Sequence, residues 1–353
     1  MNDHLIINPS LSVREAIKKL DEGAKKILMV SNEEGILVGV LTDGDIRRFI
    51  LNNGDLNKPV KEAMNNNPVS VISDDKKNAG EIMVKKSIEA LPIVTPGNEI
   101  IDIIFLKDLF EHKEFRETKQ KIALPVVIMS GGKGTRLYPY TKILPKALIP
   151  IGEKPIIEWI IDRFNEQGCT EFRLVVNHKA NLIKSYFNET EHSYAIKFID
   201  ESKPLGTAGG LYLLKNKIKT DFILSNCDIL VDIELSSAYN LHRTEKNIIT
   251  IIGSLKHFTI PYGVLNIGKN GNLESISEKP EFDYLINTGL YLLNPSVYQY
   301  IKDDQYLNMN SLIETCLKNN EKIGVFPVSE NSWTDMGQIE ELEKMLVKFG
   351  GKF

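Results

Sequence analysis

Apolar and polar residues alternate in blocks along the second part of the chain. After Leu124, short apolar runs recur and are separated by longer stretches with helical periodicity; the runs lie at 125–129, 172–176, 196–199, 222–225 and 248–252. Between the first two, Pro155–Gln167 begins with proline and is followed by Gly168, a pattern typical of a helix. Because continuous apolar strands alternate with helices, we expect a Rossmann-like α/β domain in which a mainly parallel sheet is the middle of three layers.

The first 110 residues contain an internal repeat. Ile27–Val30 aligns with Ala90–Ile93, and Gly39–Asp45 aligns with Asp102–Asp108, at a constant offset of about 63 residues. In the first copy the pattern predicts a helix, two strands and a closing helix at Ser12–Glu22, Lys26–Val30, Leu37–Leu41 and Asp43–Leu51. One such copy would leave an apolar sheet face open, whereas two copies can cover it. We therefore expect a tandem module over 1–110, with repeats at about 1–60 and 61–110.

A charged and polar stretch separates the two parts. Residues 111–122 have neither strand pattern nor glycine, so we expect a solvated linker that is followed by a second domain over 123–353. A chain of 353 residues is long enough for two domains.

Composition and charge exclude some function classes. The net charge of −4 disfavours a general nucleic-acid or membrane surface, so we expect neither partner. No apolar run approaches the roughly 18–20 residues of a spanning helix, and the N-terminus lacks a signal-peptide pattern. The three cysteines (169, 227 and 316) lie far apart, as expected of reduced thiols in a cytoplasmic protein.

The loop after the first apolar run has the composition of a phosphate site. It reads SGGKGTRLYPYTKILPK from 130 to 146 and matches neither the Walker loop nor the dinucleotide fingerprint. Gly131, Gly132 and Gly134 would let backbone N–H groups approach a phosphate, while Arg136 and Lys146 supply positive charge.

Further loops carry the other candidate residues. Glu201–Gly210 follows one predicted strand, and Asp228 ends another, where a carboxylate beside a triphosphate would bind Mg²⁺. Three more segments stand out farther along the chain: Glu278–Pro280, Ile286–Gly289 and Trp333–Gly337.

Together these segments resemble the sugar-1-phosphate nucleotidyltransferase family. The signature GGxGTRLxPxTxxxPKxLxPxxxKP runs from Gly131 to Pro155, PLGTAG occupies 204–209, and NxGxY is met by Asn287, Gly289 and Tyr291. The resemblance covers about 124–349, in the family's order. Cys227 and Tyr138 depart from the pattern, since glycine and arginine are usual there; we expect Asp228 to keep its role because cysteine is small.

The resemblance implies an in-line reaction in which a sugar-1-phosphate oxygen attacks the α-phosphorus of a nucleoside triphosphate and pyrophosphate leaves. It implies that Arg136 holds the β- and γ-phosphates, Lys146 neutralises the α-phosphate, and Lys279 binds the sugar phosphate. It assigns the remaining residues to three groups: the nucleotide site (Gly131, Gly132, Gly134, Thr135, Glu201, Gly206, Thr207), the sugar site (Gly263, Glu278, Asn287) and Mg²⁺ as cofactor (Asp228, Asp335).

The nucleobase depends on Glu201. A carboxylate only accepts hydrogen bonds, and guanine presents N1–H and N2–H₂ side by side, so GTP is favoured if this side chain points into the site. The alternatives are a UTP- or dTTP-using transferase, a non-catalytic nucleotide-binding regulator, and an enzyme that uses CTP and another acceptor. The intact set of charged residues argues against the regulator.

The N-terminal repeat resembles a CBS-domain pair (Bateman module). GVLTDGDIRR is similar to that family's ligand strand, which implies that Thr42 and Asp45 contact the ribose and phosphate of an adenine nucleotide. The second copy departs from the pattern at Asp102 and Phe105. The module either senses a nucleotide or only dimerises, and we expect a homo-oligomer. A CBS pair joined to this transferase also resembles GDP-sugar-forming enzymes of the glucosamine-1-phosphate guanylyltransferase type.

Overall fold

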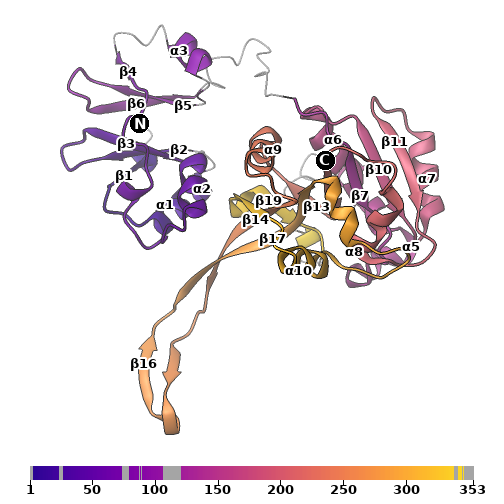
Figure 1. The fold of residues 1–353 in the computed structure, drawn as a ribbon. Helices are drawn as coiled ribbons and strands as arrows, with labels where there is room; N and C mark the ends of the chain where they lie inside the picture. The colour runs from indigo at the N-terminus through magenta and orange to yellow at the C-terminus, as the bar shows by residue number, and fades with distance from the viewer. Residues whose placement is uncertain are drawn as a thin grey trace. The chain divides into compact units, whose positions relative to one another are not determined.

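The structure, a computed structural model, describes residues 3–23, 27–73, 79–86, 88, 90–105, 121–337, 341–343 and 345. The chain divides into two compact units, Met1–Glu117 and Thr118–Phe353 (Figure 1). Most of the predicted linker at 111–122 lies outside the described residues. Among the described residues, no helix has the length and apolarity needed to cross a membrane.

The first unit contains two small sheets with the same topology. In each, a short strand pairs in parallel with a second strand, which pairs antiparallel with a third. The strands are β1 (Ile6–Ile7), β2 (Ile27–Ser31) and β3 (Leu37–Thr42), then β4 (Val71–Ile72), β5 (Ala90–Val94) and β6 (Ile100–Phe105). The helices are α1 (Val13–Gly23), α2 (Asp43–Leu51) and α3 (Ala79–Lys86). The repeat predicted from the sequence is thus visible as a repeated strand order.

The two copies meet at the ends of their hairpins. Ile36 and Glu99 form a bridge, and the N–H of Leu37 donates to the carbonyl of Asn98 at 2.9 Å. The Asn98 side chain donates in turn to the carbonyl of Leu37 at 2.7 Å. The closing helix predicted for the second copy, with Asp108, lies outside the described residues.

A seven-stranded sheet forms the centre of the second unit. Its order is β11-β10-β7-β12-β17-β14-β18. The strands are β7 (Val126–Met129), β10 (Glu171–Val176), β11 (Ala195–Asp200), β12 (Phe222–Asn226), β14 (Ile249–Thr259), β17 (Glu281–Leu293) and β18 (Ile323–Val328). Only β17 runs antiparallel to its neighbours, so the expectation of a mainly parallel sheet is confirmed.

Two separate cores cover the faces of this sheet. Val126 and Ile128 contribute to one core and Val127 to the other, because successive side chains of a strand point to opposite faces. The first face is covered by α6 (Ile156–Glu166), α7 (Ala180–Glu189) and α9 (Leu235–Thr244), the second by α10 (Met309–Lys318) and short helical turns. The predicted three-layer arrangement is therefore confirmed. The small strands β8 (Pro150–Ile151) and β9 (Lys154–Pro155) form a separate hairpin.

Two strands of the sheet continue far beyond it. β18 pairs with β14 only over Ile249–Ser254, whereas the pairing of β14 with β17 runs on to Thr259 and Glu281. The ribbon then leads into the hairpin of β15 (Val264–Ile267) and β16 (Leu273–Ser277). We call residues 255–285 the arm; Figure 1 shows it in orange, extending from β14 and β17. The apolar run at 248–252 predicted only the part of β14 inside the sheet.

Candidate functional site

The glycine-rich loop follows β7 at the carboxyl edge of the sheet. Gly134 has φ of +64°, and a Cβ there would lie 2.8 Å from the Thr141 side chain. A Cβ on Gly131 would lie 2.9 Å from Glu201 Oε2, so both glycines are needed for packing within the loop. At Gly132 a Cβ would meet nothing within 4 Å. Gly132 is therefore the position of the three where a ligand has room to approach the backbone.

The cations of this loop are held by short helical turns. Thr135 and Arg136 are exposed on a turn that the fully buried Leu137 anchors. The next helix, α5 (Tyr140–Ile143), ends under Lys179, whose ammonium donates to three backbone carbonyls at 2.7–2.9 Å. Lys179 is not among the residues predicted from the sequence, where its signal is its position directly after a strand, in VVNHK.

Two aspartates are brought together by a small ribbon. β13 (Ile229–Val231) pairs with β19 (Trp333–Asp335), which places Asp335 opposite Ile229 and next to Asp228. The N–H of Met336 donates to the carbonyl of Asp228 at 2.8 Å. The Lys146 ammonium contacts Asp228 Oδ2, and both side chains are nearly buried, at 13% and 11% exposure. Three predicted residues from distant parts of the sequence thus form one cluster.

The electrostatics of this cluster favour a cation. Burial and the nearby charge of Asp228 raise the pKa of the Asp335 carboxyl. The N–H of Gly337, which donates to Asp335 Oδ1 at 2.7 Å, and the charges of Lys146 and Arg136 act in the opposite direction. Two adjacent carboxylates that repel each other fit a Mg²⁺ ion, which usually takes one or two carboxylates and completes its shell with phosphate oxygens.

The unusual cysteine beside Asp228 belongs to the core. Cys227 is buried in the apolar cluster of the first sheet face, and burial raises the pKa of its thiol to about 12. A neutral, enclosed thiol is a poor nucleophile. Cys227 therefore supports the local packing.

In the segment after β11, the side chain of Glu201 points into the protein interior. Glu201 is buried, and its Oε1 accepts from the N–H of Leu205 at 3.0 Å. Asn177 donates to the Glu201 carbonyl at 2.5 Å, and burial raises the pKa of the Glu201 carboxyl. Oε2 points toward Gly131, so Glu201 links this segment to the glycine-rich loop. Gly206 (φ +77°) begins α8 (Gly206–Gly209), which contains Thr207.

The predicted sugar-site residues separate into two places. Asn287 lies at the base of the arm, where its side chain donates to the Tyr291 hydroxyl at 2.8 Å and accepts from the N–H of Gly289 at 3.0 Å. A Cβ on Gly289 would lie 2.5 Å from the Asn226 side chain, so this corner adjoins the end of β12.

Gly263, Glu278 and Lys279 lie on the arm instead. Glu281, where β17 begins, is six residues before Asn287 along the extended ribbon, which corresponds to about 20 Å, and Lys279 lies just beyond Glu281. Within one chain, the structure does not bring these three residues to the cluster of Lys146, Asp228 and Asp335, because the strand pairing between β14 and β17 carries them away from it.

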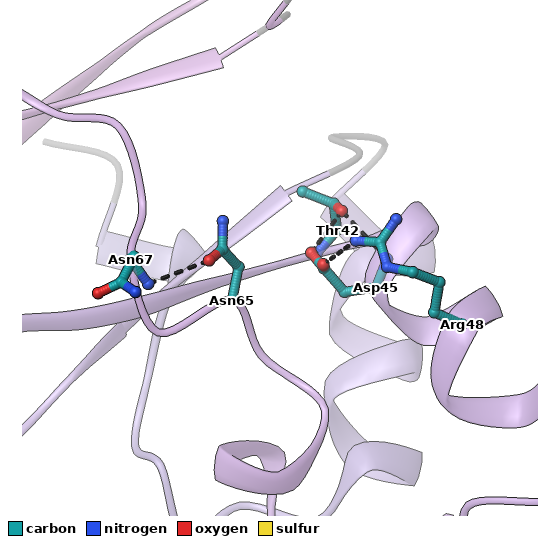
Figure 2. Close-up of polar contacts among 5 residues, drawn as sticks. All are labelled: Thr42, Asp45, Arg48, Asn65 and Asn67. Carbon is teal, nitrogen blue, oxygen red and sulfur yellow. Dashed lines mark hydrogen bonds and ion pairs between the residues drawn. The ribbon is translucent and has the colours of Figure 1, made fainter. Parts of the chain in front are cut away.

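The residues predicted to bind an adenine nucleotide have a structural role in the first unit (Figure 2). Thr42 is the N-cap of α2, and Asp45 completes a capping box with it, accepting from the Thr42 N–H at 2.9 Å and from the hydroxyl at 2.6 Å. The other oxygen of Asp45 is paired with Arg48. These bonds stabilise the start of α2 whether or not a ligand binds.

An open cavity of about 510 Å³ adjoins this capping box. Asp45, Arg48 and Asn65 line it, together with Phe49 and Met64. Figure 2 shows Asn65 across from α2, with its side chain accepting from the N–H of Asn67 at 3.0 Å. The lining thus combines a guanidinium, amide groups and an aromatic ring with the carboxylates of Asp45 and Glu62, and the volume is sufficient for a nucleotide.

Comparisons with known proteins identify both units. A sequence model of the nucleotidyl transferase family matches residues 125–349, and a CBS domain model matches residues 1–52. A UTP–glucose-1-phosphate uridylyltransferase of Synechocystis is 30% identical over 62% of this chain and 61% of its own length. A D-glycero-α-D-manno-heptose 1-phosphate guanylyltransferase of Campylobacter jejuni is 32% identical over 56% of this chain and 87% of its own. This chain therefore spans about three fifths of the first relative.

Solved structures agree with the fold. The crystal structure of HddC from Yersinia pseudotuberculosis superposes with a TM-score of 0.51 at 25% identity, over 64% of this chain and 99% of that one.

Proposed function

The chain belongs to the nucleotidyl transferase family, and on this premise we propose that it transfers a nucleoside monophosphate from a nucleoside triphosphate to a sugar-1-phosphate. An oxygen of the sugar phosphate forms the new bond to the α-phosphorus. The bond from the α-phosphorus to the bridging oxygen breaks, and pyrophosphate leaves with that electron pair. The observation that carries the proposal is the cluster of Lys146, Asp228 and Asp335 beside the glycine-rich loop.

The residues of the chain supply positioning and charge. Gly132 leaves room for the phosphates, and Arg136 binds the β- and γ-phosphates and the leaving pyrophosphate. Lys146 neutralises the charge that grows on the α-phosphate, since a preorganised cation stabilises the transition state more than the ground state. Asp228 and Asp335 would hold a Mg²⁺ ion, which supplies charge neutralisation for the triphosphate when bound.

The proposed nucleotide is GTP. Glu201 is buried and turned toward Gly131, and a buried carboxylate matches the adjacent N1–H and N2–H₂ donors of guanine. The guanylyltransferase of C. jejuni supports this choice. UTP is the alternative, because the Synechocystis relative is a uridylyltransferase. The proposed acceptor is a hexose- or heptose-1-phosphate, including glucosamine-1-phosphate.

The N-terminal unit is proposed to bind an adenine nucleotide in the cavity beside Asp45. Arg48 is exposed there and can pair with a phosphate, while Thr42 and Asp45 keep the start of α2 in place. Because Arg48 is paired with Asp45, a phosphate bound to Arg48 would also affect the capping box at the start of α2.

The decisive experiment is pyrophosphate release measured over a matrix of nucleoside triphosphates and sugar-1-phosphates, with and without AMP. We expect GTP with one sugar phosphate to give the highest kcat/KM, and to require Mg²⁺. No release with any pair would refute the transferase, and a preference for UTP or dTTP would refute the assignment of guanine.

A further inference from the structure

The arm exposes an apolar face along most of its length. In the hairpin, Leu265 pairs with Ile276 and Ile267 with Leu273, and all four side chains are more than half exposed. The other face is polar, with the Asn266 side chain donating to Ser275 at 2.9 Å. This alternation is typical of a strand pair with one buried face. In the part of the chain that the structure describes, however, nothing covers that face.

The outer part of β14 and β17 continues the same surface. Phe258 pairs with Phe282, and Tyr284 lies near both, with ring centroids 6.1 and 6.4 Å away. On the opposite face of the ribbon, Leu255 is buried and His257 Nδ1 contacts the Asp283 carboxyl group. One face of the arm is therefore aromatic and exposed, whereas on the other face Leu255 is buried and Leu285 is partly exposed.

A two-stranded ribbon of this kind is marginal by itself in water, because it buries too little apolar surface. The arm has ten large apolar side chains that are exposed by about half on average. At on the order of 200 Å² for a whole side chain, they present roughly 1,000 Å². A standard protein interface buries about 800 Å² on each partner. The arm alone thus offers enough surface for a stable interface, and patches of this size on soluble proteins commonly mark one.

The arm also carries charged residues that its own chain leaves unused. In the described part of the chain, the Lys279 ammonium has no acceptor and the Glu278 carboxylate has no donor. Lys279 adopts φ of +44°, a conformation that is rare and costly for a side chain other than glycine and that gathers at functional sites. A Cβ on Gly263 would lie 3.1 Å from Glu278 Oε2, so these residues form one group.

We propose that the arm docks on a second copy of this chain and brings Glu278 and Lys279 to the phosphate site of that partner. This inference rests on the proposed function: the acceptor is a phosphate monoester that must meet a cation, and the arm places the start of β17, next to Lys279, about 20 Å from Asn287 of its own chain. A two-fold arrangement satisfies both needs at once, since each arm covers its apolar face and completes the other chain's site.

Complementation between two defective chains tests the proposal. A Lys146→Met chain has an intact arm and a defective body, whereas a Lys279→Met chain has the reverse. We expect each homogeneous variant to lose at least about 100-fold in kcat. The two chains carry different affinity tags, are co-expressed and are purified through both tags, which yields the mixed dimer. In this dimer the body of the Lys279→Met chain receives the arm of the Lys146→Met chain, so one of the two sites is intact. Because a wild-type dimer has two equal sites and the mixed dimer has one intact site, its activity per dimer should be about half of the wild-type value.

The matched control combines Lys146→Met with Asp228→Asn, which both alter the body, so neither site is intact and activity stays low. Absence of recovery in the first pair, with wild-type protein active, would overturn the proposal and favour an arm that closes on its own chain. Equal recovery in the control pair would also overturn it.

The mass of the full chain in solution gives a second test that does not depend on activity. We expect a dimer, and Ile267→Glu should weaken its association by at least about 100-fold, as expected when a charge enters an apolar interface. A wild-type monomer, or an Ile267→Glu variant that dimerises as tightly as wild type, would refute docking of the arm. If the wild type released no pyrophosphate with any substrate pair but dimerised through Ile267, the proposed function would fail and the interface would stand.

Discussion

The contact between Lys146 and Asp228 makes a joint prediction about stability and catalysis. Both side chains are about nine-tenths buried, and Asp335 adds a second carboxylate beside Asp228. Lys146→Met keeps most of the side-chain length and removes the charge, so it leaves a buried carboxylate without its cation. Breaking a buried pair in this way costs about 3–5 kcal/mol, and we take the lower end, ~3 kcal/mol, because some solvent reaches both groups.

For a unit of this size, ~3 kcal/mol corresponds to a fall in Tm of about 6–12 °C. The same charge acts on the transferring phosphate, so kcat should fall by about 10²- to 10³-fold. Differential scanning calorimetry measures the first quantity and a coupled pyrophosphate assay the second. Lys142→Met is the matched control: Lys142 is exposed in the same loop, and its loss should leave both quantities near wild type.

The double variant Lys146→Met/Asp228→Asn separates the two roles. With both charges removed, no uncompensated carboxylate remains at residue 228, so we expect most of the lost stability to return while activity stays low. The coupling energy for stability should exceed about 1 kcal/mol, as expected of residues in direct contact. Additive stability losses, or near wild-type turnover of Lys146→Met, would refute the reasoning.

Three further predictions concern single sites. The pKa of Asp335 is raised in the folded protein, so its ionisation costs stability once the pH rises through that value. Asp335→Asn should therefore raise the Tm of the metal-free protein near neutral pH, have little effect on Tm below the ordinary carboxyl pKa, and abolish stabilisation by MgCl₂. A lower Tm of this variant at neutral pH would contradict the assigned repulsion between Asp335 and Asp228. Glu201→Gln should lower kcat/KM for GTP by about 10- to 100-fold relative to UTP, since a hydrogen bond to a charged group is lost. An unchanged ratio of the two kcat/KM values would show that Glu201 does not recognise the nucleobase. Thr42→Val and Asp45→Asn should each destabilise the first unit by about 1 kcal/mol through the lost cap, and an AMP-induced thermal shift of wild-type size in both variants would rule out the ribose assignment.

The strands and loops of the catalytic unit could be read from the sequence because their signals are local. The apolar run at 172–176 corresponds to β10, and the helix predicted at Pro155–Gln167 corresponds to α6 within one residue at each end. The repeat in the first unit was equally visible, since aligned positions such as Ile27 and Ala90 both begin a strand. Family membership of residues 125–349 followed from ordered motifs, which is also local information.

The sequence by itself determined which residue types were available: the glycines, the two cations of the loop and the aspartates. Only the tertiary structure decided which of them meet. Asp228 and Asp335 come together through pairing of β13 with β19, and Lys146 reaches them from another loop. Pairing of β14 with β17 instead carries Lys279, which the sequence predicts to bind the sugar phosphate, away from this cluster. The physical reason is that residue types and periodicity report local conformation, whereas long-range pairing depends on how whole strands match each other's hydrogen bonds and apolar faces.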